Sequence, residues 1–288
     1  MRNIQNFNIV STFLCLWLAV YLTTSLEQYL ACFFILTVGL MHGSNDIKII
    51  KRVYNNSSIS YYKTLILYIM VVLFGALMFF LIPKIALILF ILVSGFHFGE
   101  QHFHEVRFQY KWIKKSLYVS YGCAIIFLLL YTNAQESIEI ISQITGESIT
   151  INFLMVSLIS SLMVFVSCFV ILYKSITNPI RELFNILVFF IVFKTASLLW
   201  AFAIYFVLWH SLPSVLDQVK YLFKEVNKRS VLEYVKSSAI YWIVSVVGLF
   251  LLLNFLVKQE DLFYAVFFSF LAAITFPHVI VMTKIFKH

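Results

Sequence analysis

The stretch KIALILFILVSGFHFGEQHFHE, residues 84–105, sets a long apolar run directly before a group of ionisable side chains. A membrane-spanning helix needs roughly 17 to 25 predominantly apolar residues, and the first part of the stretch fits such a helix. Its last 11 residues contain three histidines and two glutamates. Because ionisable groups are costly within a membrane and normally face an interior site, the stretch indicates a helical membrane protein with a polar site near helix ends.

The whole chain has the composition of an integral membrane protein. Its 288 residues are 62% hydrophobic and 12% charged, and the mean hydropathy is +0.94, outside the usual balance of soluble domains. We find no low-complexity tract or long polar stretch, so residues 1–288 are predicted to form a single integral membrane domain. The net charge of +8 lies in short connections between apolar runs, where membrane topology explains it without a nucleic-acid partner.

The length criterion predicts an all-α fold, a polytopic transmembrane helical bundle of about 8–10 helices, with ten favoured. Lys194 alone interrupts the apolar sequence over residues 180–213. One helix of that length would reach about 50 Å, too long for an ordinary span, so two helices are favoured there. The predicted helices cover residues 8–26, 28–46, 61–82, 84–101, 114–132, 150–173, 180–194, 196–213, 237–257 and 261–283.

Basic residues test this count, because cytoplasmic connections are enriched in lysine and arginine. With ten helices and both termini in the cytoplasm, 18 of the 21 basic residues fall on the cytoplasmic side. The connection TNAQESIEIISQITGES, predicted as an outer loop, has three glutamates and no basic residue. The three exceptions are Lys84, Lys194 and Lys258. We therefore expect a multi-pass protein of the cell inner (plasma) membrane with cytoplasmic N- and C-termini.

Four histidines occupy matching positions in this topology. His42, His97, His210 and His278 each lie about 13 to 17 residues into an even-numbered predicted helix. Even-numbered helices run in the same direction, so the four side chains should share a depth toward the cytoplasmic side. A single histidine at a helix end is more often structural, but imidazole is also a good ligand for iron, zinc or copper. Convergence of all four on one metal ion is the economical interpretation.

Other polar residues near these histidines have two interpretations. Glu100 follows His97 by three residues and Asp46 follows His42 by four, so each could orient a ligand histidine or simply be a charge at a helix end. His102 and His104 are predicted to follow the helix into a charged loop, in a solvated or interfacial role. Proton or metal transport would favour carboxylates deep in the membrane, and the middle of the predicted helices contains none. Aromatic residues of one helix lead toward His210 as candidate tunnel residues, namely Trp200, Phe202, Tyr205, Phe206 and Trp209.

The ordered set of histidine segments resembles the Brp/Blh family of bacterial membrane-bound beta-carotene 15,15'-dioxygenases. The matching segments are GLMHGSND (39–46), FHFGE (96–100), WHSLPS (209–214) and PH (277–278). The resemblance implies oxidative cleavage of the central double bond of beta-carotene by dioxygen, giving two retinals. It further implies a non-haem Fe(2+) ion held by His42, His97, His210 and His278, with acidic motif positions at Asp46 and Glu100, and a functional link to a retinal-binding rhodopsin.

The chain also departs from the family pattern at two positions. Many family members have a histidine immediately after the first motif's aspartate and another four residues after the third motif's histidine, where this chain has Ile47 and Ser214. Either four histidines still complete an iron shell, or the chain is a divergent member with altered or lost activity. The alternative hypothesis is a non-catalytic carotenoid- or retinal-binding protein, or a metal-transporting membrane protein. A carrier would retain uncleaved pigment in oxygen, whereas a transporter would move metal across a membrane.

Overall fold

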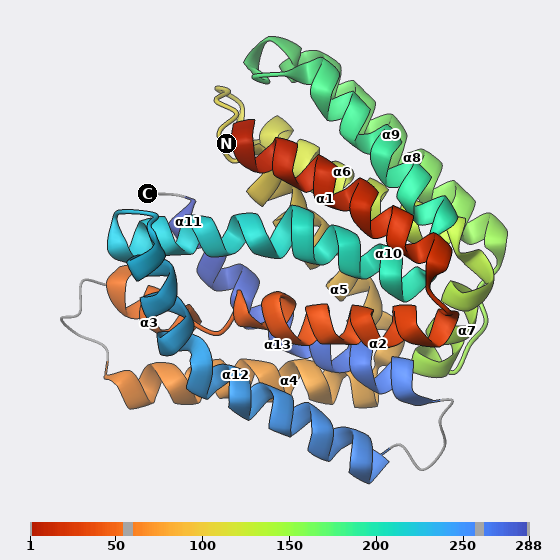
Figure 1. Ribbon diagram of the computed structural model, residues 1–288. Helices are drawn as coiled ribbons and strands as arrows, with labels where there is room; N and C mark the ends of the chain where they lie inside the picture. Colours follow the sequence, from red (N-terminus) through yellow and green to blue (C-terminus); the bar gives the residue numbers. More distant parts are fainter. Residues whose placement is uncertain (1, 54–59, 257–261, 287–288) are drawn as a thin grey trace. The chain divides into compact units, whose positions relative to one another are not determined.

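Every regular element in the part of the chain that the structure describes is a helix (Figure 1). The computed structural model describes residues 2–53, 60–256 and 262–286. In chain order the elements are α1 (Arg2–Tyr21), α2 (Thr24–Phe34), the π-helical η1 (Ile35–Gly39), α3 (Asp46–Val53), α4 (Tyr61–Leu81), α5 (Pro83–Phe103), α6 (Lys111–Thr132), α7 (Ala134–Thr145), α8 (Ile151–Leu172), the 3-10 turn η2 (Tyr173–Ser175), α9 (Pro179–Thr195), α10 (Leu198–Ile204), the π-helical η3 (Tyr205–Ser211), α11 (Leu212–Phe223), α12 (Lys228–Leu256) and α13 (Phe263–Ile285).

Among the described residues, eight helical segments are long and apolar enough to cross a membrane. Their outer surfaces carry large apolar side chains, including Phe80 of α4 (83% exposed) and Ile240 of α12 (66% exposed), as expected for contact with lipid. The all-α class is confirmed for the described residues, and the eight candidate spans indicate a multi-pass membrane protein. The count of ten is not confirmed, because two of the predicted spans correspond to shorter helices. These are α2 with η1, of 11 and 5 residues, and α9, of 17 residues.

The predicted break within residues 180–213 is present, since α9 ends at Thr195 and α10 begins at Leu198. Other predicted boundaries were wrong as well: the helix predicted over 8–26 ends at Tyr21, and the one predicted over 196–213 continues through η3 and α11 to Phe223. The connection predicted as an outer loop contains α7, the helix predicted over 28–46 stops before His42, and α12 begins at Lys228 rather than at 237. Hydropathy marks only the apolar part of a helix, whereas lysine and arginine also favour helix and extend it. The predicted end of one helix at residue 257, the predicted start of the next at residue 261, and Lys258 between them lie outside the described residues.

The chain forms two compact units, each made of three separate stretches of sequence. Unit 1 comprises residues 1–35, 91–139 and 149–213, and unit 2 comprises residues 36–90, 140–148 and 214–288. The boundaries pass through helices, α5 and α7 among them. Neither unit is a continuous segment of the sequence, and a single domain over residues 1–288 stays a prediction.

Unit 1 is organised around α6, which packs along α8 and also contacts α9. The helix α5 meets α6 at glycines: a Cβ built on Gly99 would lie 2.0 Å from Tyr118 O, and one on Gly122 would lie 2.0 Å from Gly95 O. Side chains at these positions would force the backbones apart, so the glycines permit the close approach. This contact holds the segment of α5 that carries His97.

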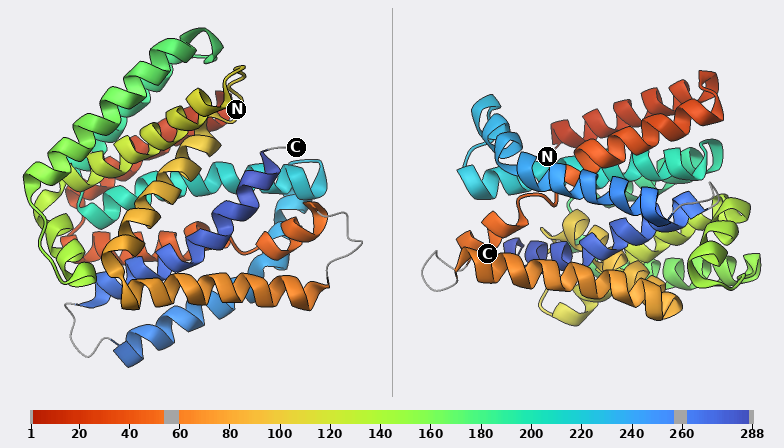
Figure 2. Two further views of the ribbon diagram at one scale, coloured as in Figure 1. Left: turned by 180° about the vertical axis from the view of Figure 1, so that it is seen from behind. Right: turned by 90° about the horizontal axis from the view of Figure 1, so that it is seen from below.

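Unit 2 is organised around α13, which contacts α3, α4 and α12. The views in Figure 2 show α13 beside α4, as does Figure 1. Two buried hydrophobic clusters pack α13 on either side of His278. One contains Ala272 and Phe79, and the other contains Met282 and Ile49. Because both clusters fix the helix, the position of His278 is set by ordinary hydrophobic packing.

Candidate metal centre

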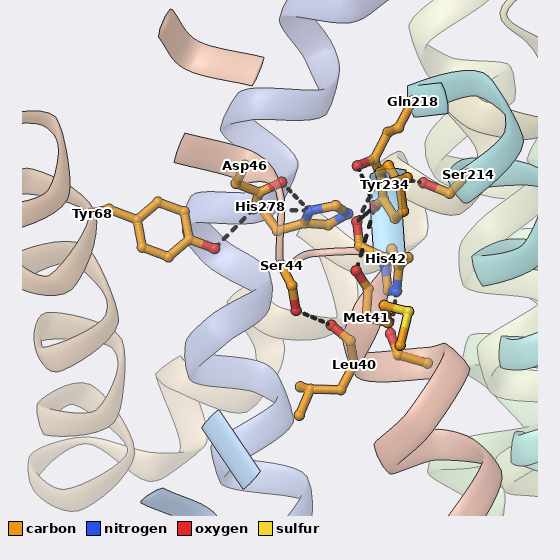
Figure 3. Close-up of polar contacts among 11 residues, drawn as sticks. Leu40, Met41, His42, Ser44, Asp46, Tyr68, Ser214, Gln218, Tyr234 and His278 are labelled. Carbon is orange, nitrogen blue, oxygen red and sulfur yellow. Dashed lines mark hydrogen bonds and ion pairs between the residues drawn. The ribbon is translucent and has the colours of Figure 1, made fainter. Parts of the chain in front are cut away.

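In unit 2, the turn after η1 and the middle of α13 bring two of the predicted histidines together (Figure 3). His42 begins the turn over residues 42–45, and His278 lies in α13 directly after Pro277. Their ring centroids are 4.6 Å apart and the ring planes are perpendicular. Both side chains are buried. The potential ligand nitrogens of the two rings lie within 4.8 Å of one another, so this pair offers two neighbouring donors for a metal ion.

Hydrogen bonds at Nδ1 orient both rings of this pair. His42 Nδ1 bonds the carbonyl oxygen of Gly39, and His278 Nδ1 lies 3.0 Å from each carboxylate oxygen of Asp46. A carbonyl or a carboxylate only accepts hydrogen bonds, so Nδ1 carries the proton in each neutral ring and Nε2 carries the lone pair. Metal-binding histidines are commonly held in this way. The donor set therefore fits a metal that accepts imidazole.

Asp46 links this pair to a third element of unit 2. It lies in the first turn of α3, where a negative charge is favourable at a helix N-terminus. Tyr68 of α4 donates its hydroxyl proton to Asp46 Oδ2 over 2.8 Å. The sequence spacing suggested that Asp46 would support His42, but the structure places its carboxylate on His278 (Figure 3). The turn over residues 42–45 changes the direction of the chain and breaks the expected helical spacing.

The other two predicted histidines form a similar pair within unit 1. His97 belongs to α5 and His210 to the π-helical η3. Their ring centroids are 4.8 Å apart, with an interplanar angle of 80°. They are only 1% and 2% exposed. Each unit thus contains one buried pair of imidazoles, and both pairs supply the same kind of donor.

Aromatic side chains surround His210. Phe206 stacks on its ring with centroids 5.6 Å apart, and Phe98 of α5 lies 4.6 Å from it. Among the candidate tunnel residues, Phe206 therefore contacts a candidate ligand directly. Trp200 and Trp209 instead donate their indole N–H groups to a backbone carbonyl and a hydroxyl of α1. These two indoles anchor α10 and η3 to α1, and a tunnel remains a prediction.

Three further polar residues of the stretch 84–105 are Glu100, His102 and His104, and each has its own environment in unit 1. Glu100 is buried in α5, one turn after His97. His102 is not in a loop, because α5 continues to Phe103; its Nε2 lies 2.5 Å from Glu182 Oε2 of α9. His104 follows in the turn, where its Nδ1 bonds Gln101 O over 2.8 Å. The two later histidines thus have oxygen partners of their own in unit 1.

Two glutamines beside the histidine pairs were missed by the sequence analysis. Gln101 Nε2 donates to His210 O over 2.9 Å in unit 1, and Gln218 Nε2 donates to His42 O over 2.7 Å in unit 2. A signal was present, since an amide side chain in an apolar helix normally bonds a neighbouring helix.

The two departures from the family pattern also have defined places. Ser214 is fully buried in α11 and its hydroxyl oxygen accepts a hydrogen bond from Gln218 Nε2 over 3.1 Å. Ile47 is buried in α3. A serine hydroxyl and an aliphatic side chain occupy these positions, so the imidazole donors of unit 2 come from His42 and His278.

Comparison with known proteins agrees with the resemblance seen in the sequence. Searches of curated proteins and of solved structures found no match. A family model described as "Beta-carotene 15,15'-dioxygenase" matches residues 33–286, a range that includes all four candidate histidines. The match covers most of the chain, and the chain therefore belongs to the beta-carotene 15,15'-dioxygenase family.

Proposed function

We propose that this protein cleaves beta-carotene at its central 15,15' double bond with dioxygen and releases two molecules of retinal. The carbon–carbon double bond breaks, and each of its two carbons takes one oxygen atom of the dioxygen molecule. The reaction balances without a further reductant. Family membership supports the substrate and the reaction type.

The observation that carries the proposal is the pair of oriented imidazoles in unit 2, together with its counterpart in unit 1. We propose that His42, His97, His210 and His278 are ligands of one ferrous ion, for which imidazole is a suitable donor. When bound, the ion would supply the redox chemistry for reaction with dioxygen. The chain's own part is to hold the donors: Asp46 and Gly39 retain the Nδ1 protons and present Nε2.

The apolar surroundings of the histidines suit a polyene substrate. Phe98 and Phe206 lie against His210 and present aromatic faces and edges rather than hydrogen-bonding groups. Such surfaces favour an apolar chain and exclude water. We propose that they hold beta-carotene with its central double bond beside the histidines. The bond that is cleaved would then be selected by how the two halves of the substrate fit the apolar surroundings.

A membrane location suits an apolar substrate. Beta-carotene dissolves in lipid, and the multi-pass helical class gives the protein access to it. We propose that the protein lies in the inner (plasma) membrane with both termini in the cytoplasm, as its basic residues indicate. Its product would serve a retinal-binding rhodopsin.

The direct test supplies purified protein with Fe(II), beta-carotene and oxygen, and measures retinal by chromatography beside an active family member. Retinal is expected in both samples. Bound pigment that stays uncleaved would instead indicate a carrier, and metal flux into vesicles without cleavage would indicate a transporter. In parallel, the variant His97→Ala should lose near-stoichiometric iron, and unchanged iron content would remove His97 from the site.

A further inference from the structure

Each histidine pair is accompanied by one buried glutamine that binds the main chain of a candidate ligand. In unit 1, Gln101 Nε2 lies 2.9 Å from His210 O. In unit 2, Gln218 Nε2 lies 2.7 Å from His42 O. The two glutamines are 6% and 0% exposed. The same kind of hydrogen bond, from a glutamine amide to the carbonyl of a candidate ligand, therefore occurs once in each unit, from a different helix in each case.

The chemistry of the acceptor fixes the direction of both bonds. A main-chain carbonyl only accepts, so each glutamine must present its NH₂ group to the histidine. In unit 2 the other end of the amide is fixed as well, because Tyr234 donates its hydroxyl to Gln218 Oε1 over 2.9 Å. Figure 3 shows Tyr234 and Gln218 meeting at His42. An amide held at both ends has one orientation available.

These carbonyls belong to backbone that lacks a regular α-helical ladder. His210 lies in η3, where hydrogen bonds follow the wider π register, as in the bond from Leu212 N to Val207 O. His42 lies in a turn between η1 and α3, whose main-chain bonds use the carbonyls of Leu40 and Met41 among others. In each segment a glutamine supplies a side-chain donor to a buried carbonyl.

The position of Gln101 gives its bond a further consequence. Gln101 follows His97 by four residues in α5, so the two side chains share one helix face. His97 contacts the ring of His210, and one turn further along α5 Gln101 bonds the main chain of the same residue. Two neighbouring residues of one helix face therefore hold the ring and the backbone of His210. Gln218 acts on the His42 turn from α11.

We infer that Gln101 and Gln218 are positioning residues for metal binding by His210 and His42. Neither glutamine contacts the ion; each fixes the main chain from which an imidazole projects. The inference rests on the proposed function, since it assumes that these histidines bind a divalent first-row metal. Changes in residues that orient metal ligands commonly lower metal affinity by about 10- to 100-fold. Because these glutamines act through the main chain, a loss of roughly tenfold is expected from each.

The test measures Co(II) binding to purified full-length protein by titration and by the visible absorption of the bound ion. The variants are Gln101→Leu, Gln218→Leu and their combination. Asn133→Leu is the matched control, because Asn133 also donates a side-chain amide to a main-chain carbonyl, that of Phe193, in unit 1. Gln101→Glu and Gln218→Glu preserve size but replace the NH₂ donor, and serve where a leucine variant does not fold. Thermal unfolding of the metal-free proteins separates stability from affinity.

The expected result is weaker Co(II) binding and an altered absorption spectrum for each glutamine variant, a product of the two effects in the combined variant, and wild-type values for Asn133→Leu. Wild-type affinity and spectrum in folded glutamine variants would overturn the inference while leaving the proposed function intact. Absence of Co(II) and Fe(II) binding by the wild-type protein would overturn both. A general loss of stability alone would lower the folded fraction but leave the spectrum of the bound ion unchanged.

Discussion

Asp46 holds two neighbours at once, since its carboxylate accepts hydrogen bonds from His278 Nδ1 and from the Tyr68 hydroxyl. All three side chains belong to unit 2 and come from different helices. The carboxylate favours the tautomer with the lone pair on Nε2 and makes that nitrogen a stronger donor. The orientation of His278 thus depends on Asp46, which would not need to touch a bound metal ion.

Replacing Asp46 by asparagine tests this role with little change in size. The amide can present either an oxygen or an NH₂ group to His278, so the imidazole loses its strong acceptor. We expect Asp46→Asn to lower iron affinity by about 10- to 100-fold, measured as iron retained per chain during titration with a chelator. Tyr68→Phe removes one supporting bond only and should have a smaller effect. Equal iron retention in Asp46→Asn and the wild-type protein would contradict the role.

Individual residues show which parts of the site a sequence can predict. The four histidines stand out because imidazole is rare in apolar helices, and two pairs of them do meet within their units. The spacing offered His42 as one possible partner of Asp46, whereas the carboxylate bonds His278, because a turn separates Asp46 from His42. Gln218 and Gln101 gain their meaning only from contacts with main-chain atoms far along the sequence, which no local pattern reports.

At the scale of helices, the contact between α5 and α6 depends on glycine. A Cβ on Gly99 would lie 2.0 Å from the Tyr118 carbonyl oxygen, and a backbone atom cannot turn aside as a side chain can. We expect Gly99→Ala to destabilise the protein by about 1–3 kcal/mol through overpacking. Because the same helix carries His97, iron retention should fall as well. Thermal unfolding in detergent and iron analysis measure the two effects.

The matched control for this prediction is Gly248→Ala in α12. A Cβ at Gly248 would meet nothing within 4 Å, and alanine has the higher helix propensity by roughly 1 kcal/mol. Gly248→Ala should therefore leave stability unchanged or slightly raised. If both variants behaved alike, the close approach of α5 and α6 would not be what makes glycine necessary.

A second link between helices joins α5 to α9 through His102 and Glu182. The two side chains are 14% and 10% exposed, and Asn185 Nδ2 also donates to Glu182 over 3.2 Å. Glu182→Gln replaces a carboxylate acceptor shared by His102 and Asn185 with a weaker one. Removing one partner of a largely buried polar pair commonly destabilises a protein by about 1–3 kcal/mol.

We therefore expect Glu182→Gln to lower the thermal midpoint while iron content per folded chain stays at the wild-type value. Glu225→Gln, at an exposed position after α11, is the control and should unfold like the wild-type protein. Loss of iron from folded Glu182→Gln would show that His102 and Glu182 act on the candidate centre after all.

Helices as elements were predicted well where they are long and uniformly apolar, as for α4 and α8. Their boundaries were predicted less well, and the π-helical turns η1 and η3 were not predicted. Leucine, valine and phenylalanine suit α- and π-helical turns alike, so hydropathy does not distinguish them. In η3 the difference matters, because the π register includes His210 itself.

At the scale of the whole molecule, the candidate ligands are divided equally between two units. Unit 1 contains His97 and His210, and unit 2 contains His42 and His278. Membership of the family extends over both. If the four histidines share one ion, as proposed, then metal binding and the stability of the complete chain must be linked.

A shared ion fixes the iron content, and the linkage makes stability depend on iron; iron analysis and thermal unfolding check these two predictions. Purified protein should contain one iron per chain, and the double variant His42→Ala/His278→Ala should lose all of it rather than half. Iron at about 100 times its dissociation constant should stabilise the wild-type protein by about 2.7 kcal/mol, so a chelator should lower its thermal midpoint and leave that of the double variant unchanged. His104→Ala, which removes an imidazole bonded to Gln101 O, should keep full iron content. Two irons per chain, or half occupancy in the double variant, would mean that each pair binds its own ion, because only a shared ion requires both pairs at once.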